Sequence, residues 1–482
     1  MRFAKLKILL FVAVTASPLV SVVLLGPVGP YGNVARLPEF PTRKQLLNMQ
    51  PGALDRLAEA ALARSAIRRT SIELKNTVNA DVVRFIDTPE IVSGTGDWLF
   101  LKAELWPKCL HEATLRPAIA NLDLLAGLAR AAGIDVVVSM SPDKATIYPS
   151  QLHPFAQRFW RCKAAGSALL RRLLAEEAPQ VIDHAAPILS GRQHHPGHKL
   201  YFHTDTHWTP LGGALAFRQL MAHIFPNSAA LPEPRLSGQT AMTPTDLRNS
   251  MLLLKELEEK ELLVPLSDAD MARVNSDEPG YKTVVLGDSF YATLKPEMTR
   301  VFPNFKFVSL ESRPDVFGEP IATADRLIVN SIERALPARA SDGILSSQGA
   351  VAEQVLKRNM KRAADCIDFA PVTNSGDEHP RTIRPPPPST RSANRLTCLR
   401  FEIDSREARS VALRFGTAGV HPVDGSRRIS IAMGAGRQAA TLIVPENYAG
   451  GWVDIETPAG VTLTAVEVGT IVQPTILTDS NR

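Results

Sequence analysis

The chain has 482 residues, of which 45% are hydrophobic and 21% charged, and its net charge is +5. These values are ordinary for a globular protein long enough for two or three domains. The positive charge is spread along the chain without a dense basic block. This argues against nucleic acid as a partner, although it suits an anionic membrane surface or an acidic polymer.

The N-terminal segment has basic residues at Arg2, Lys5 and Lys7 and then no charge until Arg36. Its apolar stretch, from Ile8 to Leu25, is close to the roughly 20 residues that span a bilayer. The preceding basic residues favour a cytoplasmic N-terminus and export of the rest. We therefore expect residues 1–29 to be an uncleaved signal anchor in the cytoplasmic membrane, with a cleaved signal peptide as the alternative.

The remaining chain divides by its pattern into four parts. Residues 30–90 show helical periodicity and are expected to form a helical neck. Residues 91–337 alternate short apolar runs with helical segments, which predicts an α/β domain with a mostly parallel sheet. Residues 338–395 indicate a helix and a Pro-rich linker, and residues 396–482 predict a small β-sandwich from short alternating strands and turn signals.

The four cysteines are Cys109, Cys162, Cys366 and Cys398, and none belongs to a CxxC pair that would indicate a zinc cluster. An even number in an exported chain favours two disulfides. Local pairing would link Cys109 to Cys162 and Cys366 to Cys398. Free buried thiols are the alternative.

Two separate segments contain the groups of a nucleophilic catalyst. Residues 203–210 contain Asp205 and His207, and residues 284–290 contain Ser289. A serine hydroxyl becomes a good nucleophile when an imidazole takes its proton and a carboxylate orients that imidazole. We expect Ser289 to begin the helix after its strand, where its own N–H faces a developing oxyanion. The structural alternative is that these residues only cap helices and form turns.

Further candidates lie at the carboxyl ends of the predicted parallel strands, where the loops form the ligand crevice of such a sheet. Lys144 follows one strand, and Asn330 ends another and is a candidate oxyanion partner. Residue 291 is Tyr, so the segment around Ser289 is not the G-x-S-x-G turn of the α/β-hydrolases.

A metal site is the rival chemistry, because five histidines are close together: His194, His195, His198, His203 and His207. On an extended strand, residues 203, 205 and 207 could present three ligands together. Against this, Pro196-Gly197 breaks any helical histidine pair, and neither Cys nor Glu completes a set. We therefore expect neither a metal nor another cofactor.

In this combination the chain resembles the SGNH-like O-acetyltransferases of the alginate-acetylation type, which are exported or membrane-anchored proteins that modify bacterial exopolysaccharides. As in that family, Asp and His precede Ser. The matching segments occur in the family's order over roughly residues 50–337: Ser93–Phe100, Ser141–Lys144 with Tyr148-Pro149, Asp205–Trp208, Thr245–Leu247 and Gly287–Phe290. The resemblance implies an SGNH-like fold with Ser289 as nucleophile, His207 as general base and Asp205 as its orienting carboxylate.

The resemblance also implies a function and partners. The enzyme would be a periplasmic O-acetyltransferase that acts on a polysaccharide acceptor, supplied with acetyl groups by a membrane-bound O-acyltransferase. The β-sandwich would be similar to a carbohydrate-binding module. From their residue type rather than from the resemblance, we also expect Trp208 and Tyr291 to stack on sugar rings beside the triad, with core packing as the alternative. The rival functions are an esterase with the same triad and a non-catalytic glycan-binding or assembly protein.

Overall fold

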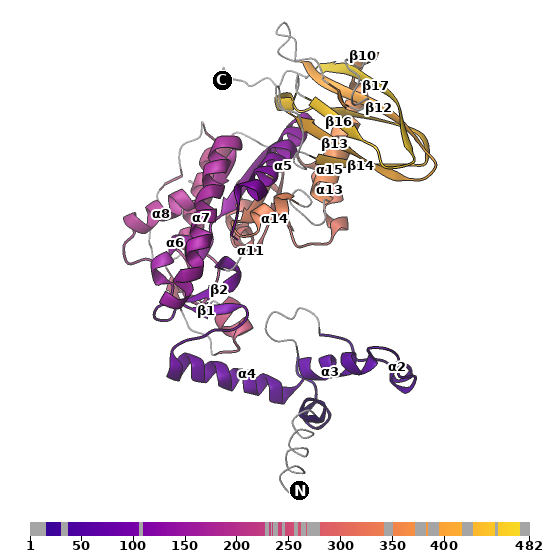
Figure 1. Ribbon diagram of the computed structural model, residues 1–482. Coiled ribbons are helices and arrows are strands. Elements are labelled where there is room, and N and C mark those ends of the chain that lie inside the picture. Colours follow the sequence, from indigo (N-terminus) through magenta and orange to yellow (C-terminus); the bar gives the residue numbers. More distant parts are fainter. Residues whose placement is uncertain are drawn as a thin grey trace.

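The computed structural model has three parts along the chain, namely a group of N-terminal helices, an α/β domain and a pair of antiparallel sheets (Figure 1). It describes residues 16–29, 37–105, 109–226, 231–232, 234, 240–242, 246–254, 259–261, 267, 280–341, 350–371, 382–383, 395–416, 428–448 and 452–472.

The N-terminal part consists of short helices. One helix covers residues 16–25. It is followed by α2 (Arg43–Leu47), α3 (Ala53–Ala63), α4 (Ala66–Val78) and a π-helical turn, η1 (Asn79–Val83). Thr42 begins α2 with a capping box to Gln45, and the Ser65 hydroxyl caps α4 by accepting from the Arg68 N–H.

The predicted membrane anchor lies only partly within this helical segment. Residues 8–15 of the apolar stretch lie outside the described residues. Among the helices that are described, none is both long and apolar enough to cross a membrane.

The α/β domain is built on one five-stranded sheet in the order β4-β3-β9-β7-β8, and every neighbouring pair of strands is parallel. The strands are β3 (Asp135–Ser141), β4 (Val181–Asp183), β7 (Lys282–Gly287), β8 (Asn304–Ser309) and β9 (Arg326–Ile332). Every residue of β9 is buried, as expected for a central strand covered on both faces. The predicted mostly parallel sheet is confirmed.

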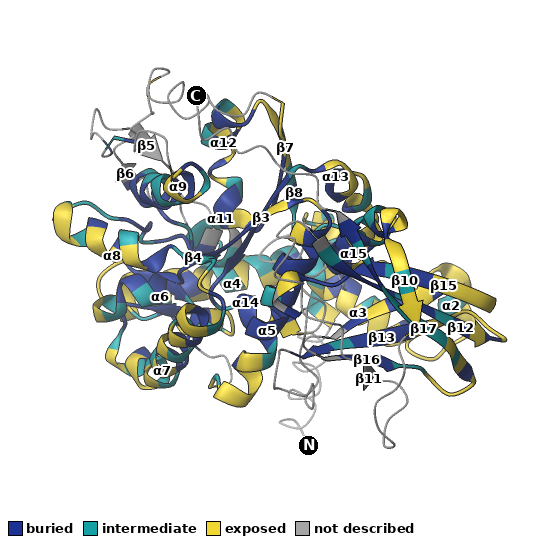
Figure 2. Cartoon of the chain, turned by 90° about the horizontal axis from the view of Figure 1, so that it is seen from above, coloured by how far each residue is buried: buried dark blue, intermediate teal, exposed yellow. Residues whose placement is uncertain are grey.

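Helices cover both faces of this sheet, and Figure 2 shows the buried strands between exposed outer helix faces. One face packs on α5 (Glu112–Ala131), much of α7 (Pro154–Glu177), α13 (Gly318–Thr323), α14 (Leu336–Ser341) and α15 (Ala350–Arg362). The other packs on α6 (Lys144–Ile147), α8 (Ala185–His194), α9 (Pro210–Ile224), α11 (Ser289–Ala292) and α12 (Lys295–Val301).

Short elements complete the domain. Two small antiparallel pairs are β1 (Ile91–Ser93) with β2 (Leu99–Leu101), and β5 (Thr240–Met242) with β6 (Glu259–Glu261). The short helices are η2 (Lys102–Glu104), η3 (Pro149–Gln151), η4 (Asp246–Met251), η5 (Pro314–Val316), η6 (Ala363–Asp365) and, beyond this domain, η7 (Glu446–Tyr448).

The C-terminal part consists of two four-stranded antiparallel sheets whose inward residues share one core, with Phe401 from one sheet and Phe415 from the other. The first sheet is β10 (Ile367–Pro371), β17 (Val461–Val472), β12 (Arg395–Ser405) and β15 (Gly436–Ile443). The second is β11 (Thr382–Ile383), β16 (Trp452–Glu456), β13 (Arg409–Gly416) and β14 (Arg428–Met433). The edge strands β10 and β11 lie in residues 338–395, where the sequence indicated only a helix and a linker.

Both predicted disulfides are confirmed. Cys109 is bonded to Cys162 of α7, with their Cα atoms 5.4 Å apart, and Cys366 is bonded to Cys398 of β12, with 6.3 Å between Cα atoms. The second bridge joins the end of η6 to the first antiparallel sheet.

Buried polar contacts fix the antiparallel sheets to the α/β domain. The side chain of Asn359 in α15 accepts from the Ile443 N–H (2.8 Å) and donates to the carbonyls of Ile443 (3.1 Å) and Leu128 (3.4 Å). The Tyr448 hydroxyl donates to Asp123 on α5 (2.9 Å). The two parts therefore share a specific interface along α5 and α15.

Candidate active site

Ser289 is the first residue of α11, immediately beyond the carboxyl end of β7, and its side chain is exposed. Asp288 is the N-cap, and its Oδ1 accepts from the Phe290 N–H (3.1 Å). A Cβ added at Gly287 would lie 2.9 Å from that of Tyr291. The turn that presents Ser289 therefore requires glycine, and the Asp288 carboxylate caps the short helix that follows.

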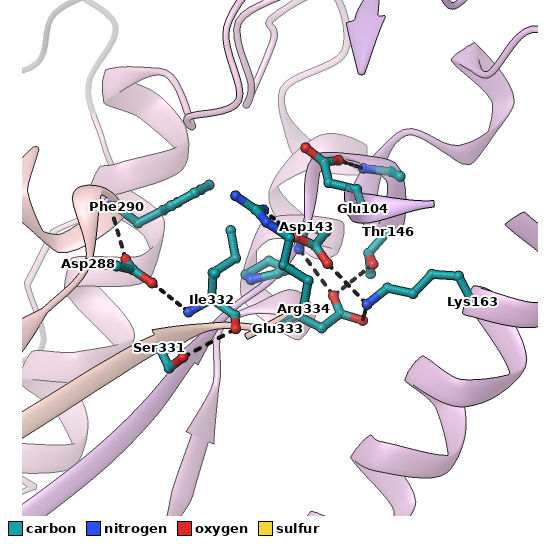
Figure 3. A network of polar contacts seen from close by, with 12 residues as sticks. Glu104, Asp143, Thr146, Lys163, Asp288, Phe290, Ser331, Ile332, Glu333 and Arg334 are labelled. Carbon is teal, nitrogen blue, oxygen red and sulfur yellow. Dashed lines mark hydrogen bonds and ion pairs between the residues drawn. The ribbon is translucent and has the colours of Figure 1, made fainter. Parts of the chain in front are cut away.

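The second carboxylate oxygen of Asp288 joins this turn to the neighbouring strand. It accepts from the Ile332 N–H (2.6 Å) and from Arg339 (3.3 Å), as Figure 3 shows for Ile332. Burial raises the pKa of Asp288, and the nearby Arg339 opposes that rise. Asp288 is thus committed to the backbone, while the hydroxyl beside it is left at the surface.

Asp205 and His207 form a pair on the loop before α9. Asp205 Oδ1 accepts from His207 Nδ1 (2.6 Å) and from the His207 backbone N–H (2.9 Å). A carboxylate on Nδ1 selects the tautomer whose Nε2 can act as a base. Burial alone would raise the pKa of Asp205, but the hydrogen bond from His207 and the His207 charge hold it below its usual value.

The two predicted segments meet in space. The imidazole of His207 lies against the ring of Phe290, with 5.0 Å between ring centroids, and Phe290 directly follows Ser289. Trp208 packs edge-on against the same ring at 5.1 Å, and its Nε1 donates to Thr293 Oγ1 (2.8 Å). The Asp205–His207 loop is therefore packed against the short helix that Ser289 begins.

Two buried charged side chains, Lys144 and Glu259, hydrogen-bond the backbone of the loop that carries Asp205 and His207. The Lys144 ammonium, which is fully buried, donates to the carbonyls of Phe202 (3.2 Å), His203 (3.1 Å) and Asp205 (2.7 Å). The Glu259 carboxylate accepts from the backbone N–H groups of His203 (3.0 Å) and Thr204 (3.1 Å). Lys144 therefore holds the loop through its backbone carbonyls, and the expectation that it contacts substrate is wrong.

The family segment around residue 245 contributes to the same loop. The Leu247 N–H donates to the Thr204 carbonyl at 3.2 Å. Thr245 lies outside the described residues.

Two aromatic candidates are core residues rather than crevice walls. Tyr291 is fully buried, and its hydroxyl contacts Ser139 Oγ (2.7 Å) and His184 Nε2 (2.8 Å). Trp208 is 2% exposed. Burial lowers the pKa of His184 to about 4, so this imidazole is neutral. The prediction that Trp208 and Tyr291 stack on sugars is wrong, and the alternative of core packing holds.

Asn330 is also an internal residue. Its amide donates to the hydroxyls of Ser139 (3.1 Å) and Ser141 (3.0 Å) across the β3–β9 pair, and its side chain is fully buried. Hydrogen bonds between strands occupy its donors, so the expected role as an oxyanion partner is wrong.

The sequence did not indicate the cluster of buried charges at the ends of β3 and β9 (Figure 3). Asp143 contacts Lys163 (3.1 Å) and Arg334 (2.6 Å). Glu333 accepts from Thr146 (2.7 Å), from the Asp143 N–H (3.1 Å) and from an arginine of α7. Glu333-Arg334 directly follow a predicted strand, and this position could have indicated a charge cluster at the strand end. Lys163 lies inside a long helix, where nothing in the sequence indicated such a role.

The charges in this cluster compensate one another. Burial would raise the pKa of Glu333, but Arg171 and Lys163 lower it to about 2. Glu333 is therefore ionised at every physiological pH. Because its oxygens are engaged by protein donors, it serves the fold of the strand ends rather than a substrate.

The five clustered histidines lie in different places, with His207 in the candidate site. His194 and His195 line a cavity of about 500 Å³ between α8 and α9, together with Arg218 and Gln219. The ring of His203 packs on Trp98, at 4.4 Å between centroids. Within the described ranges, no three His, Cys, Asp or Glu side chains come together as metal ligands do.

Comparisons with known proteins agree with the motifs. Residues 91–293 match the family described as "SGNH hydrolase-like domain, acetyltransferase AlgX". The predicted resemblance is confirmed. The segment contains Asp205, His207 and Ser289, so the candidate site lies wholly within the matched domain.

Two curated relatives are named "Probable alginate O-acetylase AlgJ". The Azotobacter vinelandii protein is 28% identical over 166 residues, which is 33% of this chain and 38% of the relative. The Pseudomonas fluorescens protein is 24% identical over 155 residues, 30% of this chain and 36% of the relative. The chain thus spans less than two fifths of the length of these relatives.

Solved structures with similarity include the O-acetyltransferase domain of Pseudomonas putida AlgJ, at 17% identity and a TM-score of 0.35, covering 55% of this chain and 99% of that one. Pseudomonas aeruginosa AlgX is 13% identical with a TM-score of 0.35, covering 80% and 95%.

Proposed function

We propose that this protein is an O-acetyltransferase that transfers an acetyl group to a hydroxyl of a polysaccharide outside the cytoplasm. The observation that carries the proposal is the Asp205–His207 pair packed against the helix that Ser289 begins. The match to an acetyltransferase family over residues 91–293 supports it, as do relatives named for alginate O-acetylation.

The chemistry follows from three side chains. The Ser289 hydroxyl attacks the acetyl carbonyl of a donor ester as His207 takes its proton, and the donor alcohol leaves with that proton. A polysaccharide hydroxyl then attacks the acetyl-serine, loses its proton to His207 and leaves as an acetyl ester, while Ser289 regains the proton. Asp205 holds the imidazole in the required tautomer, and the backbone N–H of Ser289 itself donates to the oxyanion.

The location and the partners are parts of the same proposal. Acetyl-coenzyme A is cytoplasmic, so an exported enzyme needs a donor presented at the membrane. A membrane-bound O-acyltransferase meets that need. The antiparallel sheets beside α15 would hold the polysaccharide chain near the crevice.

The rival is an esterase that uses the same residues with water as the acceptor. The burial of Trp208 and Tyr291 weakens one reason for preferring sugar, since neither presents a face to the crevice. The acceptor is therefore the property that an experiment must decide.

The decisive experiment gives purified protein a surrogate acetyl ester with and without oligosaccharides. Intact-mass analysis should detect an acetyl adduct on wild type and none on Ser289→Ala. Acetylated oligosaccharide supports the transferase, whereas free acetate alone favours the esterase. A folded Ser289→Ala variant with normal turnover would remove the acyl-enzyme mechanism, and activity lost to a chelator and restored by zinc would point to a metal.

A further inference from the structure

The helices of the N-terminal part expose large apolar side chains that a helix in water would bury. On α4, Ile67, Leu74 and Val78 are 45%, 64% and 43% exposed. These residues are spaced i, i+7 and i+11, so they lie on one face of the helix. A contiguous apolar face of this kind on a protein surface marks an interaction site.

That face points away from the α/β domain. Asn76 is the one buried residue of α4, and its amide donates to the Leu252 carbonyl at 2.8 Å. Asn76 is two residues from both Leu74 and Val78, which places it on the opposite side of the helix. The domain therefore holds α4 by its polar side and leaves the apolar face outward.

Polar residues border the apolar face in an ordered way. Arg68 and Lys75 follow Ile67 and Leu74 by one position each, so both lie along the same edge of the face. Long basic side chains in this position lay their methylene groups on apolar surface and direct their charges outward. Such an edge fits a layer of anionic headgroups.

The helix over residues 16–25 is a second exposed apolar element beside the start of α4. It is joined to the neck by a buried hydrogen bond between Ser21 and Ser65 (2.9 Å) and by the Val28 N–H to the Arg64 carbonyl (3.1 Å). Its outer side chains are exposed and apolar: Leu19, Val20, Val23, Leu24 and Leu25. In Figure 1 these helices form the end of the molecule farthest from the antiparallel sheets.

We propose that α4 and the helix over residues 16–25 form a membrane-surface platform that lies in the headgroup region of a lipid bilayer. The apolar face of α4 enters the boundary with the acyl chains, and Arg68 and Lys75 meet the phosphates. A bilayer fits better than a protein partner because the joined helix 16–25 is uncharged and exposes further apolar side chains, and because one edge of the α4 face carries the basic Arg68 and Lys75. The platform holds the α/β domain at a fixed height and orientation above the membrane, whatever chemistry that domain performs.

The proposal can be tested by spin labelling of single introduced cysteines. All four native cysteines are paired, so a single introduced cysteine is the only thiol available to a spin label. The full chain is labelled at Leu74→Cys and reconstituted into vesicles of phosphatidylethanolamine and phosphatidylglycerol. Glu73→Cys on another side of α4 and Glu407→Cys in the turn between β12 and β13 are matched controls, and thermal melts check that each variant is folded.

The platform predicts that the Leu74 label is reached by oxygen in preference to a water-soluble nickel chelate, with a ratio severalfold above that of both controls. Equal access of both reagents at Leu74 would overturn the proposal. Shielding from both reagents, seen only in native membranes that contain other proteins, would also overturn it and identify a protein as the occupant.

Discussion

The two halves of the sheet's carboxyl edge use polar residues in opposite ways. Beyond β7, Ser289 is exposed and lies beside a loop whose His207 is only partly buried. Beyond β3 and β9, Asp143 and Glu333 are buried and bond to protein groups, among them Lys163 of α7. Both halves carry motif residues shared with the family. The segments that resemble the family therefore include an exposed hydroxyl beside a histidine–carboxylate pair as well as buried charges that hold the strand ends together.

The largest effect is expected on the β7 side. Ser289→Ala and His207→Ala should each lower the turnover of an acetyl ester by about 10⁴-fold or more. Because the two act as a unit, the double variant should be little slower than either single variant. The unfolding midpoint of Ser289→Ala should barely change, since Ser289 is exposed. Multiplicative losses in the double variant would show that the two residues do not act in one step.

Substitutions at the ends of β3 and β9 should lower the free energy of unfolding rather than turnover. Glu333→Gln leaves buried cations without one of their partners, and breaking a buried pair of this kind costs roughly 3–5 kcal/mol. The pKa of Glu333 is about 2, below the unfolded value of 4.5. Its stabilisation is therefore complete above pH 4.5 and is lost as the pH falls toward 2.

Urea denaturation across this acid range should show a weaker pH dependence for Glu333→Gln than for wild type. Any Glu333→Gln protein that remains folded should keep nearly normal turnover per folded molecule. A large loss of turnover without loss of stability would show that Glu333 takes part in the reaction. It would contradict the assignment of the β3–β9 residues to stability alone.

Lys144 shares features of both groups of residues. It is buried like Asp143 and Glu333, but it hydrogen-bonds the loop that carries Asp205 and His207. Lys144→Met removes three hydrogen bonds to the loop and should lower kcat by roughly 10–100-fold with little change in KM. Lys144→Arg keeps the charge but replaces a three-donor ammonium with a planar fork, so it should recover activity only partly.

A spectroscopic readout separates positioning by Lys144 from a general loss of structure. In folded Lys144→Met, the downfield proton resonance of the His207–Asp205 hydrogen bond should shift or broaden. An unchanged resonance with normal kcat would show that the loop holds its shape without Lys144.

Some features of this protein could be predicted from the sequence, and others depend on the three-dimensional arrangement of the side chains. The parallel sheet, both disulfides and the position of Ser289 at a helix start were predictable because each depends on local pattern or on residue type. The roles of Lys144 and Asn330 were not, because strand position shows which edge a residue reaches but not whether its side chain turns outward or inward. Glu259 was missed for a related reason, since it acts on residues 203 and 204 from a distant segment.

In the N-terminal helices, the sequence pattern predicted the helices but not which way their apolar faces point. Helical periodicity indicated helices there, but the same spacing is normally taken to mean a face turned to a protein core. On α4 that face is exposed, and the buried residue is the polar Asn76. Only the three-dimensional arrangement distinguishes a face that packs inward from one that is left for a partner.

The smallest effect is expected at Glu104, a buried carboxyl of η2 that accepts from the Ala145 N–H (3.1 Å). Burial, followed by the neighbouring Asp143, raises the pKa of Glu104 from 4.5 to about 7. Between these values the folded state keeps a proton that the unfolded state has released, so stability falls as the pH rises through this window. Glutamine cannot ionise, and Glu104→Gln should remove that fall, which amounts to at most roughly 3 kcal/mol. Urea denaturation of wild type, Glu104→Gln and the exposed control Glu353→Gln at several pH values would measure it. Parallel pH profiles for wild type and Glu104→Gln would mean that Glu104 is already ionised in the folded protein.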